Sequence, residues 1–139
     1  MRTLLFGLIL LGVVGLGFAQ KPEIRDVPLK PTPAESGSAM FSEYCAVCHG
    51  KDAKGSGPAA PALKVLPPDL TMLARRNSGK FPAAQVSNAI RSGGEALAHG
   101  SKDMPMWGRA FMSLTPHDDA IVKQRVANLT DYIESLQQK

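Results

Sequence analysis

The residues with the clearest chemistry lie together in one short segment. The only two cysteines of the chain, Cys45 and Cys48, are three positions apart, and His49 follows the second directly. On one helical turn, two thiols at this spacing reach the two vinyl groups of one porphyrin, and the adjacent imidazole is held beneath its iron. The segment therefore predicts covalent attachment of haem through Cys45 and Cys48, with His49 as an axial ligand of the iron.

Three other uses of these residues have less support. A thioredoxin-like redox motif needs strands around the cysteines, and no stretch of the chain alternates like a strand. A structural zinc site needs four ligands, and only His99 and His117 are left to complete one, neither at the spacing of a zinc finger. A disulfide between Cys45 and Cys48 stays an alternative, although it leaves His49 without a role.

A second segment offers a ligand for the other face of the iron. Met104 and Met106 flank Pro105 well downstream of the cysteines. A thioether is a soft ligand that suits haem iron, and the proline stiffens the backbone that presents it. From the residues alone, either methionine is a candidate for the sixth ligand, and His99 is a third.

The elements that position these residues are predicted to be helices joined by long loops. Four helices are expected, over residues 36–48, 69–76 and 82–92 and from Thr115-Pro116 to near the end of the chain. Ser36 and Asp69 are good N-cap residues for the first two, and Gly93 ends the third. The last helix carries apolar residues at helical spacing from Ile121 to Leu136. The fold class is therefore predicted to be all-α.

Two long irregular loops are expected between these helices, over residues 50–68 and 93–114. Loops of this length are unusual in a compact domain unless they have a task, such as wrapping a cofactor. A domain this short also has a thin core of its own, which a large apolar group would complete.

The overall composition narrows the classes of protein. The chain has 139 residues, which is enough for one domain, and a formal net charge of +4. Basic charge of this size, spread along the sequence, does not indicate a nucleic-acid-binding protein. A charged fraction of 20% with 44% hydrophobic residues predicts a folded chain.

The N-terminus is predicted to be an export signal over residues 1–19. Arg2 precedes an apolar run, and the small residues Gly17 and Ala19 stand at the −3 and −1 positions of a cleavage site. The run is shorter than the roughly 20 residues of a bilayer span, so cleavage is expected and an uncleaved anchor is the alternative. The domain is thus expected in an oxidising compartment, the periplasm.

Between the signal and the first helix lies a proline-rich segment. Residues 20–35 hold four prolines and are expected to form an extended tail or tether outside the core. The folded domain is therefore predicted to cover residues 36–139.

Four motifs in this order make the chain resemble the class I c-type cytochromes, which are small, all-α, single-haem electron carriers. The motifs are Gly37-x-x-x-Phe41-x-x-x-Cys45, Cys45-Ala46-Val47-Cys48-His49-Gly50, Met104-Pro105-x-Trp107-Gly108 and Leu129-x-x-Tyr132-Ile133-x-x-Leu136. The resemblance covers residues 36–138 and implies a cytochrome c fold, with one haem c wrapped by long loops. It also implies that the N- and C-terminal helices cross closely, which the glycine of the first motif allows.

The resemblance further implies roles for single residues. Met104 matches the methionine that ligates the iron in the bacterial branch of the family. Pro61 matches the proline whose carbonyl accepts a hydrogen bond from the proximal histidine ring, with Pro58 as the alternative, and Leu63 matches a residue that packs on the haem. Trp107 is expected either to hydrogen-bond a haem propionate or to pack behind residues 104–106, which we call the methionine loop.

The expected function is one-electron transfer between periplasmic or membrane-bound redox partners, because an iron with two protein ligands has no open site for a substrate. The alternative is a dedicated haem subunit of a periplasmic dehydrogenase or oxidase, and an association with the membrane is expected only through a retained leader or a membrane-bound partner. Basic residues on the two loops favour a partner with an acidic docking surface. They are Lys51, Lys54, Lys64 and Lys102.

Overall fold

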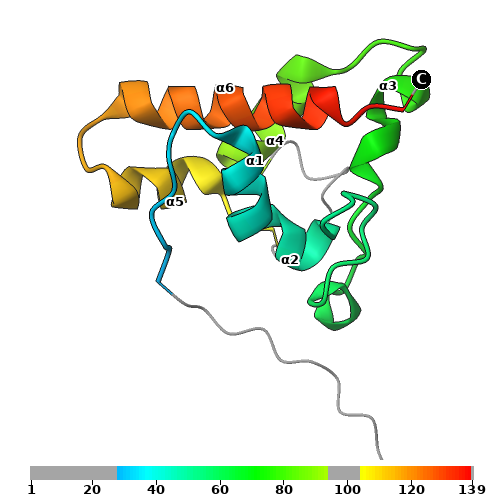
Figure 1. Cartoon of the computed structure of the whole chain (residues 1–139), viewed down its shortest axis with the longest axis horizontal. Coiled ribbons are helices and arrows are strands. Elements are labelled where there is room, and N and C mark those ends of the chain that lie inside the picture. The colour runs from blue at the N-terminus through cyan, green and yellow to red at the C-terminus, as the bar shows by residue number, and fades with distance from the viewer. Residues whose placement is uncertain (1–27, 94–103, 139) are drawn as a thin grey trace, which may run out of the picture.

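The computed structural model describes residues 28–93 and 104–138, and these ranges contain helices and loops without a strand (Figure 1). In chain order the elements are α1 (Gly37–Met40), the π-helix η1 (Phe41–Cys45), α2 (Ala46–His49), the 3₁₀ helices η2 (Ala60–Ala62) and η3 (Leu70–Met72), α3 (Leu73–Arg76), α4 (Ala83–Ser92), α5 (Trp107–Leu114) and α6 (Asp119–Ser135). The predicted all-α class is confirmed. None of the helices in these ranges has both the length and the apolar character needed to cross a bilayer. The predicted export signal at residues 1–19 lies outside the described residues.

The elements α1, η1 and α2 form one continuous helical segment that begins at the predicted cap. Ser36 has an extended backbone, and its hydroxyl accepts a hydrogen bond of 3.2 Å from the amide of Ala39. The π-helical turn was not predicted: the amide of Ala46 donates to the carbonyl of Phe41, five residues back. Because this turn holds one extra residue, Ala46 and then His49 continue the buried face on which Phe41 lies.

The longest helix, α6, crosses this N-terminal segment at close range (Figure 1). A Cβ atom on Gly37 would lie 2.1 Å from the carbonyl oxygen of Asn128 and 2.8 Å from the Cβ of Tyr132. One turn further on, the ring of Phe41 lies against that of Tyr132, with their centroids 5.4 Å apart. Glycine is therefore the residue that fits at position 37, and the close crossing implied by the resemblance is confirmed.

The start of α6 lies later in the chain than predicted. Thr115 and Pro116 belong to the turn that follows α5, and His117 in that turn has a positive φ of 67°, which a helix does not contain. The N-cap is Asp118, whose carboxylate accepts a hydrogen bond of 3.0 Å from the amide of Ile121. The predicted apolar face of the helix is in the core, where Val122, Val126, Leu129 and Ile133 are buried.

The helix α5 corrects the expectation of one irregular loop over residues 93–114. Residues 107–114 form a helix that packs against α4 and α6. Trp107 and Phe111, one turn apart, are both buried, so this short helix is stabilised mainly by tertiary packing. The remainder of that predicted loop falls largely in residues 94–103, outside the described residues.

The helix α4 follows the prediction for residues 82–92 closely. It begins one residue after Pro82 and ends at Gly93, whose φ of 84° lies in the left-handed region that favours glycine. Its buried residues Ala89 and Ile90 lie on a helix that packs against both α5 and α6. These three helices and the N-terminal segment enclose the core.

The segment η3–α3 also begins at its predicted cap. It is hydrogen-bonded to the residues that follow α6 at the C-terminus. The carboxylate of Asp69 accepts a hydrogen bond of 2.9 Å from the amide of Thr71. Just beyond α6, the side-chain oxygen of Gln137 accepts from the amide of Ala74, and its nitrogen donates to the carbonyl of Leu70, each over 2.8 Å. The end of the chain is thereby held against residues 70–74.

Residues 28–35, which we call the N-terminal strap, correct the expectation of a tail outside the core. Leu29 packs against the hydrophobic core. The carbonyls of Thr32 and Ala34 accept hydrogen bonds of 2.8 Å from Arg125 and Asn128 of α6. A proline-rich extended segment has no internal hydrogen bonds, so its carbonyls are available to side chains of a neighbouring helix. The folded unit thus begins before residue 36.

Candidate haem site

The residues predicted to attach haem are brought together on one turn of the N-terminal helical segment. Cys45 ends η1, and Cys48 and His49 lie in α2. The two thiols are not joined in a disulfide, and the His49 side chain is buried, with 7% of its surface exposed. Two thioether-forming sulfurs and a buried imidazole on one turn form a donor set that fits a covalently held haem.

The electrostatics of this turn do not suit thiol redox chemistry. Burial, and to a smaller extent the neighbouring Cys48 thiol, raise the pKa of Cys45 to about 12. Such a thiol holds very little thiolate at neutral pH, whereas redox-active cysteines react as thiolates. No group of three or more His, Cys, Asp or Glu side chains within residues 28–93 and 104–138 is arranged to hold a metal ion. His117, one of the two histidines considered for zinc, is exposed on the turn before α6.

The loop that follows this turn folds back and donates hydrogen bonds to the last carbonyl groups of α2. The amides of Gly55, Gly57 and Ala59 donate to the carbonyls of His49, Cys48 and Val47 over 2.7, 3.0 and 2.9 Å. The last carbonyls of a helix lack partners within it, so the loop supplies them. A Cβ atom on Gly57 would lie 2.5 Å from the carbonyl oxygen of Val47 and 2.6 Å from that of Ala46. Only glycine allows the loop to come this close, and the loop then fixes the turn that carries the thiols.

The same loop brings to α2 the two residues that are expected to support the haem and its histidine ligand. Pro61 lies in η2, which packs against α2, and Leu63 follows directly after it. The Pro61 side chain is exposed and that of Leu63 is half-buried. Pro58, the alternative to Pro61, is exposed on the same loop. The roles of all three toward the haem stay predictions.

The two candidate methionines differ in their surroundings. Met104 is half-buried and packs against the hydrophobic core. Met106 is 44% exposed and lies at the N-cap of α5, where its carbonyl accepts hydrogen bonds from the amides of Arg109 and Ala110. The third candidate, His99, lies outside the described residues.

Trp107 belongs to an aromatic cluster that was not expected from the sequence. Its buried ring has its centroid 5.3 Å from that of Tyr44 and 5.7 Å from that of Phe111. Tyr44 immediately precedes Cys45, and Trp107 comes directly after the segment with the two methionines. Trp107 is therefore packed in the core against Tyr44 and Phe111, and both of its expected roles, behind the methionine loop and toward a haem propionate, stay predictions. Tyr44 had a detectable signal, because it falls at helical spacing from Phe41 on the same buried face.

Together, the crossed helices, the thiol turn and the loop that closes over it define an all-α domain that carries a covalently bound haem. The family model described as "Cytochrome c" matches residues 34–137, which is most of the chain. The protein therefore belongs to the cytochrome c family and binds haem c, with Cys45 and Cys48 at the spacing of the attachment motif. Members of this family serve in haem-based electron transfer with redox partner proteins. No solved structure was found to match the chain.

Proposed function

We propose that this protein carries single electrons between periplasmic redox partners through one haem c whose iron is ligated by His49 and Met104. The observation that carries the proposal is the contact between Tyr44 and Trp107, with ring centroids 5.3 Å apart. This contact joins the residue before the first attachment cysteine to the helix that follows the methionine loop. When bound, the haem supplies an Fe(III)/Fe(II) couple whose potential methionine ligation raises.

His49 and Met104 suit a carrier better than an enzyme. The His49 imidazole is buried on a turn whose carbonyls are fixed by the following loop, so its position changes little when the charge of the site changes. Met104 is the methionine that packs on the core, whereas Met106 is 44% exposed. A site closed on both sides by protein ligands leaves no position for a substrate, and this favours electron transfer.

Three further residues have proposed roles beside these ligands. We propose that, in the haem-loaded protein, the carbonyl of Pro61 accepts a hydrogen bond from Nδ1 of His49, which would orient the ring and fix its tautomer. The packing of η2 against α2 and the burial of that nitrogen support this role. Leu63 packs on the haem, and Trp107 supports the methionine loop, which its place in the aromatic cluster favours.

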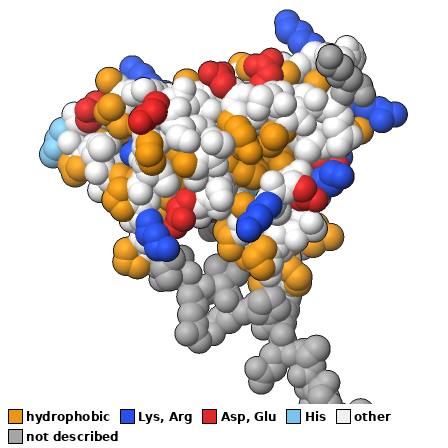
Figure 2. Space-filling view, in the orientation of Figure 1, with side chains coloured by type: hydrophobic (Ala, Val, Ile, Leu, Met, Phe, Trp, Pro, Cys, Tyr) orange, Lys and Arg blue, Asp and Glu red, His pale blue; other side chains and the backbone are white. Residues whose placement is uncertain are grey.

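The proposed partner is a redox protein with an acidic docking surface. Three lysines on the loop after α2 are exposed: Lys51, Lys54 and Lys64. On the face shown in Figure 2, acidic and basic side chains are interspersed over the rest of the molecule. Three basic side chains on one loop would steer an approaching partner toward the end of the molecule that carries the attachment turn. The fourth lysine considered for this role, Lys102, lies outside the described residues.

A second candidate function is that of a haem subunit held permanently by a dehydrogenase or oxidase. The observation in its favour is that Val65 and Leu66, on the same loop, are 53% and 69% exposed. Large apolar side chains at the surface of a loop are typical of protein interfaces. Purification of the tagged protein from its own cells separates the two candidates. A free carrier elutes as a small protein, whereas a subunit elutes with a stoichiometric catalytic chain.

The localisation and the domain boundaries are part of the same proposal. Residues 1–19 act as a cleaved signal peptide that delivers the chain to the periplasm, where covalent attachment keeps the haem on the protein. Residues 20–27 then lead into the N-terminal strap, with which the folded unit begins. The N-terminal sequence of the mature protein tests this directly, and a mature chain that starts at Met1 would contradict it.

The experiment that tests the proposed function is an absorption spectrum of the protein produced with haem-attachment machinery. Sharp bands in the reduced state, together with the weak long-wavelength band of iron–thioether ligation in the oxidised state, are expected. Haem bands without the long-wavelength band would contradict Met104 as a ligand and favour His99 or an open iron. A protein that takes up no haem would overturn the proposal as a whole.

A further inference from the structure

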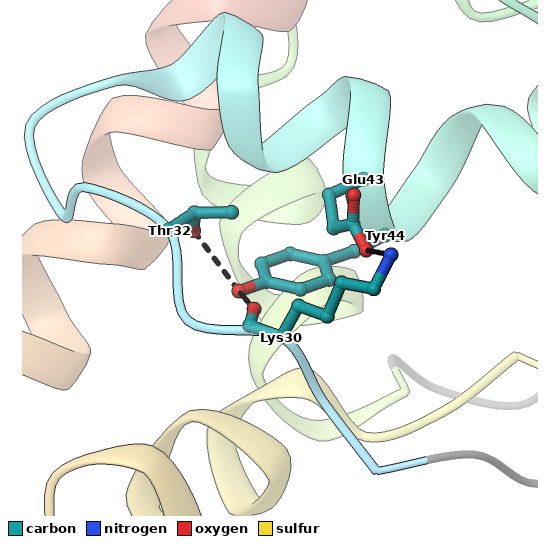
Figure 3. A network of polar contacts seen from close by, with 4 residues as sticks. All are labelled: Lys30, Thr32, Glu43 and Tyr44. Atoms are coloured by element: carbon teal, nitrogen blue, oxygen red, sulfur yellow. Dashed lines mark hydrogen bonds and ion pairs between the residues drawn. The ribbon is translucent and has the colours of Figure 1, made fainter.

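The N-terminal strap holds one aromatic side chain of the core by its hydroxyl group (Figure 3). The hydroxyl of Tyr44 donates to the carbonyl of Lys30 over 2.6 Å and lies 2.9 Å from the hydroxyl of Thr32. Lys30 also forms an ion pair with Glu43 at 3.8 Å, but its side chain is 81% exposed, so this pair adds little. The strap therefore acts on the N-terminal helical segment mainly through the two hydrogen bonds of Tyr44.

A buried guanidinium fastens the strap from the other side. Arg125 of α6 is 5% exposed, and it donates to the carbonyl of Thr32 over 2.8 Å and to its hydroxyl over 3.1 Å. Its guanidinium also lies 5.7 Å from the centre of the Phe111 ring and 3.6 Å from the sulfur of Met40. A buried charge is costly unless its donors are satisfied. The strap accepts from both terminal nitrogens of Arg125, while its Nε has no hydrogen-bond partner among the described residues. Thr32 is thus held by a helix while it in turn holds Tyr44.

The contacts of Tyr44 continue to the methionine loop. Its ring centroid lies 5.3 Å from that of Trp107 and 5.6 Å from that of Phe111, and all three rings are buried. Trp107 is separated from Met104 by only Pro105 and Met106, and proline restricts the backbone at that point. A shift of the Trp107 ring is therefore passed to the backbone that carries Met104.

We propose that Tyr44 is a positioning residue for the sixth iron ligand, and that the N-terminal strap locks the Tyr44 side chain in place. This inference rests on the proposed ligation by His49 and Met104. When the lock is intact, the aromatic cluster holds the loop in the geometry in which Met104 reaches the iron. When the lock is opened, the equilibrium shifts toward the form in which Met104 has left the iron.

Two conservative variants of the haem-loaded protein test the lock. Tyr44→Phe removes the hydroxyl and keeps the ring, and Thr32→Val removes the hydroxyl on the strap and leaves the aromatic cluster intact. For each, the long-wavelength iron–thioether band is followed as the pH and then the temperature are raised. Tyr44→Phe loses the hydrogen bonds to Lys30 and Thr32, and Thr32→Val loses those with Tyr44 and Arg125. We expect the equilibrium constant for release of Met104 to rise about two- to tenfold in each variant, an effect at least as large as that of one intramolecular hydrogen bond. The reduction potential is expected to fall in the same variants, because the methionine-free form is favoured.

A matched control separates positioning from general stability. Gln137→Ala removes the hydrogen bonds to Ala74 and Leu70 beyond the C-terminal end of α6, where no contact with Tyr44 or the strap is involved. It is expected to lower the unfolding temperature while the release constant stays that of the parent protein.

Three results would overturn the inference. The first is an unchanged release constant in both Tyr44→Phe and Thr32→Val. The second is an equal rise in Gln137→Ala at the same loss of unfolding temperature, which would reduce the effect to general stability. The third is a parent protein without the iron–thioether band. This third result contradicts the assignment of Met104 as a ligand. It can be distinguished from a failure of the Tyr44 inference because it is seen in the parent protein, before any substitution is made.

Discussion

At the scale of single residues, the two methionines near α5 provide the sharpest test of the site. Met104→Ala is expected to abolish the long-wavelength band of the oxidised protein and to lower the reduction potential, because the thioether ligand is lost. Met106→Ala is expected to keep both, since its side chain is 44% exposed and its backbone carbonyl, which accepts from Arg109 and Ala110, is unaffected. The measurement is the absorption spectrum of each haem-loaded variant in the oxidised state. The reverse result would identify Met106 as the ligand of the iron.

Asp69 gives a residue-scale prediction of pH dependence. Its carboxyl pKa is lowered from the ordinary 3.8, mainly because the hydroxyl of Thr71 donates to it over 2.6 Å. A carboxylate with a lowered pKa stabilises the fold above its ordinary pKa, and this contribution is lost as the pH falls through the lowered value. Asp69→Ala is therefore expected to cost about 1 kcal/mol of unfolding free energy at neutral pH, typical of a lost N-cap, with a smaller difference near pH 3.

Urea denaturation of the haem-loaded protein at neutral and at acidic pH measures this difference. Asp69→Asn is the control, because it keeps an oxygen that accepts from the amide of Thr71 and carries no charge. Its advantage over Asp69→Ala is expected to be the same at both pH values. A wild-type advantage over Asp69→Ala that grows toward low pH would contradict the expected direction of the pH dependence.

At the scale of elements, the close approach of the loop to α2 predicts a strong effect at Gly57. In Gly57→Ala the new methyl group meets the carbonyl oxygens of Val47 and Ala46 at 2.5 and 2.6 Å, so the loop must move and its hydrogen bonds to α2 weaken. We expect a loss of about 1–3 kcal/mol in unfolding free energy, the usual cost of overpacking. Urea denaturation measures it, with Ser56→Ala on the exposed neighbour as a control that changes little. Equal stability of the two variants would show that the loop is not held against α2.

Local signals were enough for some elements of this fold. Ser36 and Asp69 cap helices with their own side chains, and Gly93 ends a helix because it adopts a positive φ. The helices beside these residues were therefore predicted close to their observed bounds. The crossing at Gly37 was expected only from the resemblance, because its reason is a helix more than ninety residues away. The attachment turn was predicted because Cys45, Cys48 and His49 all lie within five consecutive residues of the sequence.

Elements that depend on distant contacts were missed. The helix α5 is short and begins two residues after Pro105, so the burial of Trp107 and Phe111 against the core is what stabilises it as a helix. The N-terminal strap is held by Arg125, and a charged residue is ordinarily expected at the surface. A signal was present, because Arg125 stands among Val122, Val126 and Leu129 on the buried face of the last helix.

At the scale of the whole molecule, the distribution of charge predicts how the protein exchanges electrons with charged partners. The net charge is +4, and Lys51, Lys54 and Lys64 lie on one exposed loop. With these three changed to Gln, the rate of electron exchange with an anionic metal complex is expected to fall several-fold at low ionic strength. The rate is expected to approach that of the parent protein at high salt, because screening removes the attraction.

A control variant separates local steering from total charge. Arg75, Lys80 and Lys123 are exposed on other segments, and changing all three to Gln alters the net charge by the same amount. Stopped-flow rates for this variant are expected to fall less than those of the loop variant. Equal rates for the two variants would mean that only the total charge matters and that the loop is not a docking site.

The bonds between the strap and α6 also bear on the order in which the chain folds. Thr32 and Arg125 are 93 residues apart in the sequence, and Ala34 and Asn128 are 94 apart. Contacts of such separation close a very large loop, whose entropy must be lost before the contact contributes anything. The strap is synthesised early and can contact Tyr44 nearby in the sequence, but the side chains of Arg125 and Asn128 that hold its carbonyls are in place only after the last helix has formed. We therefore expect it to be the final piece to settle during folding, and a break near the C-terminus would release the N-terminus as well.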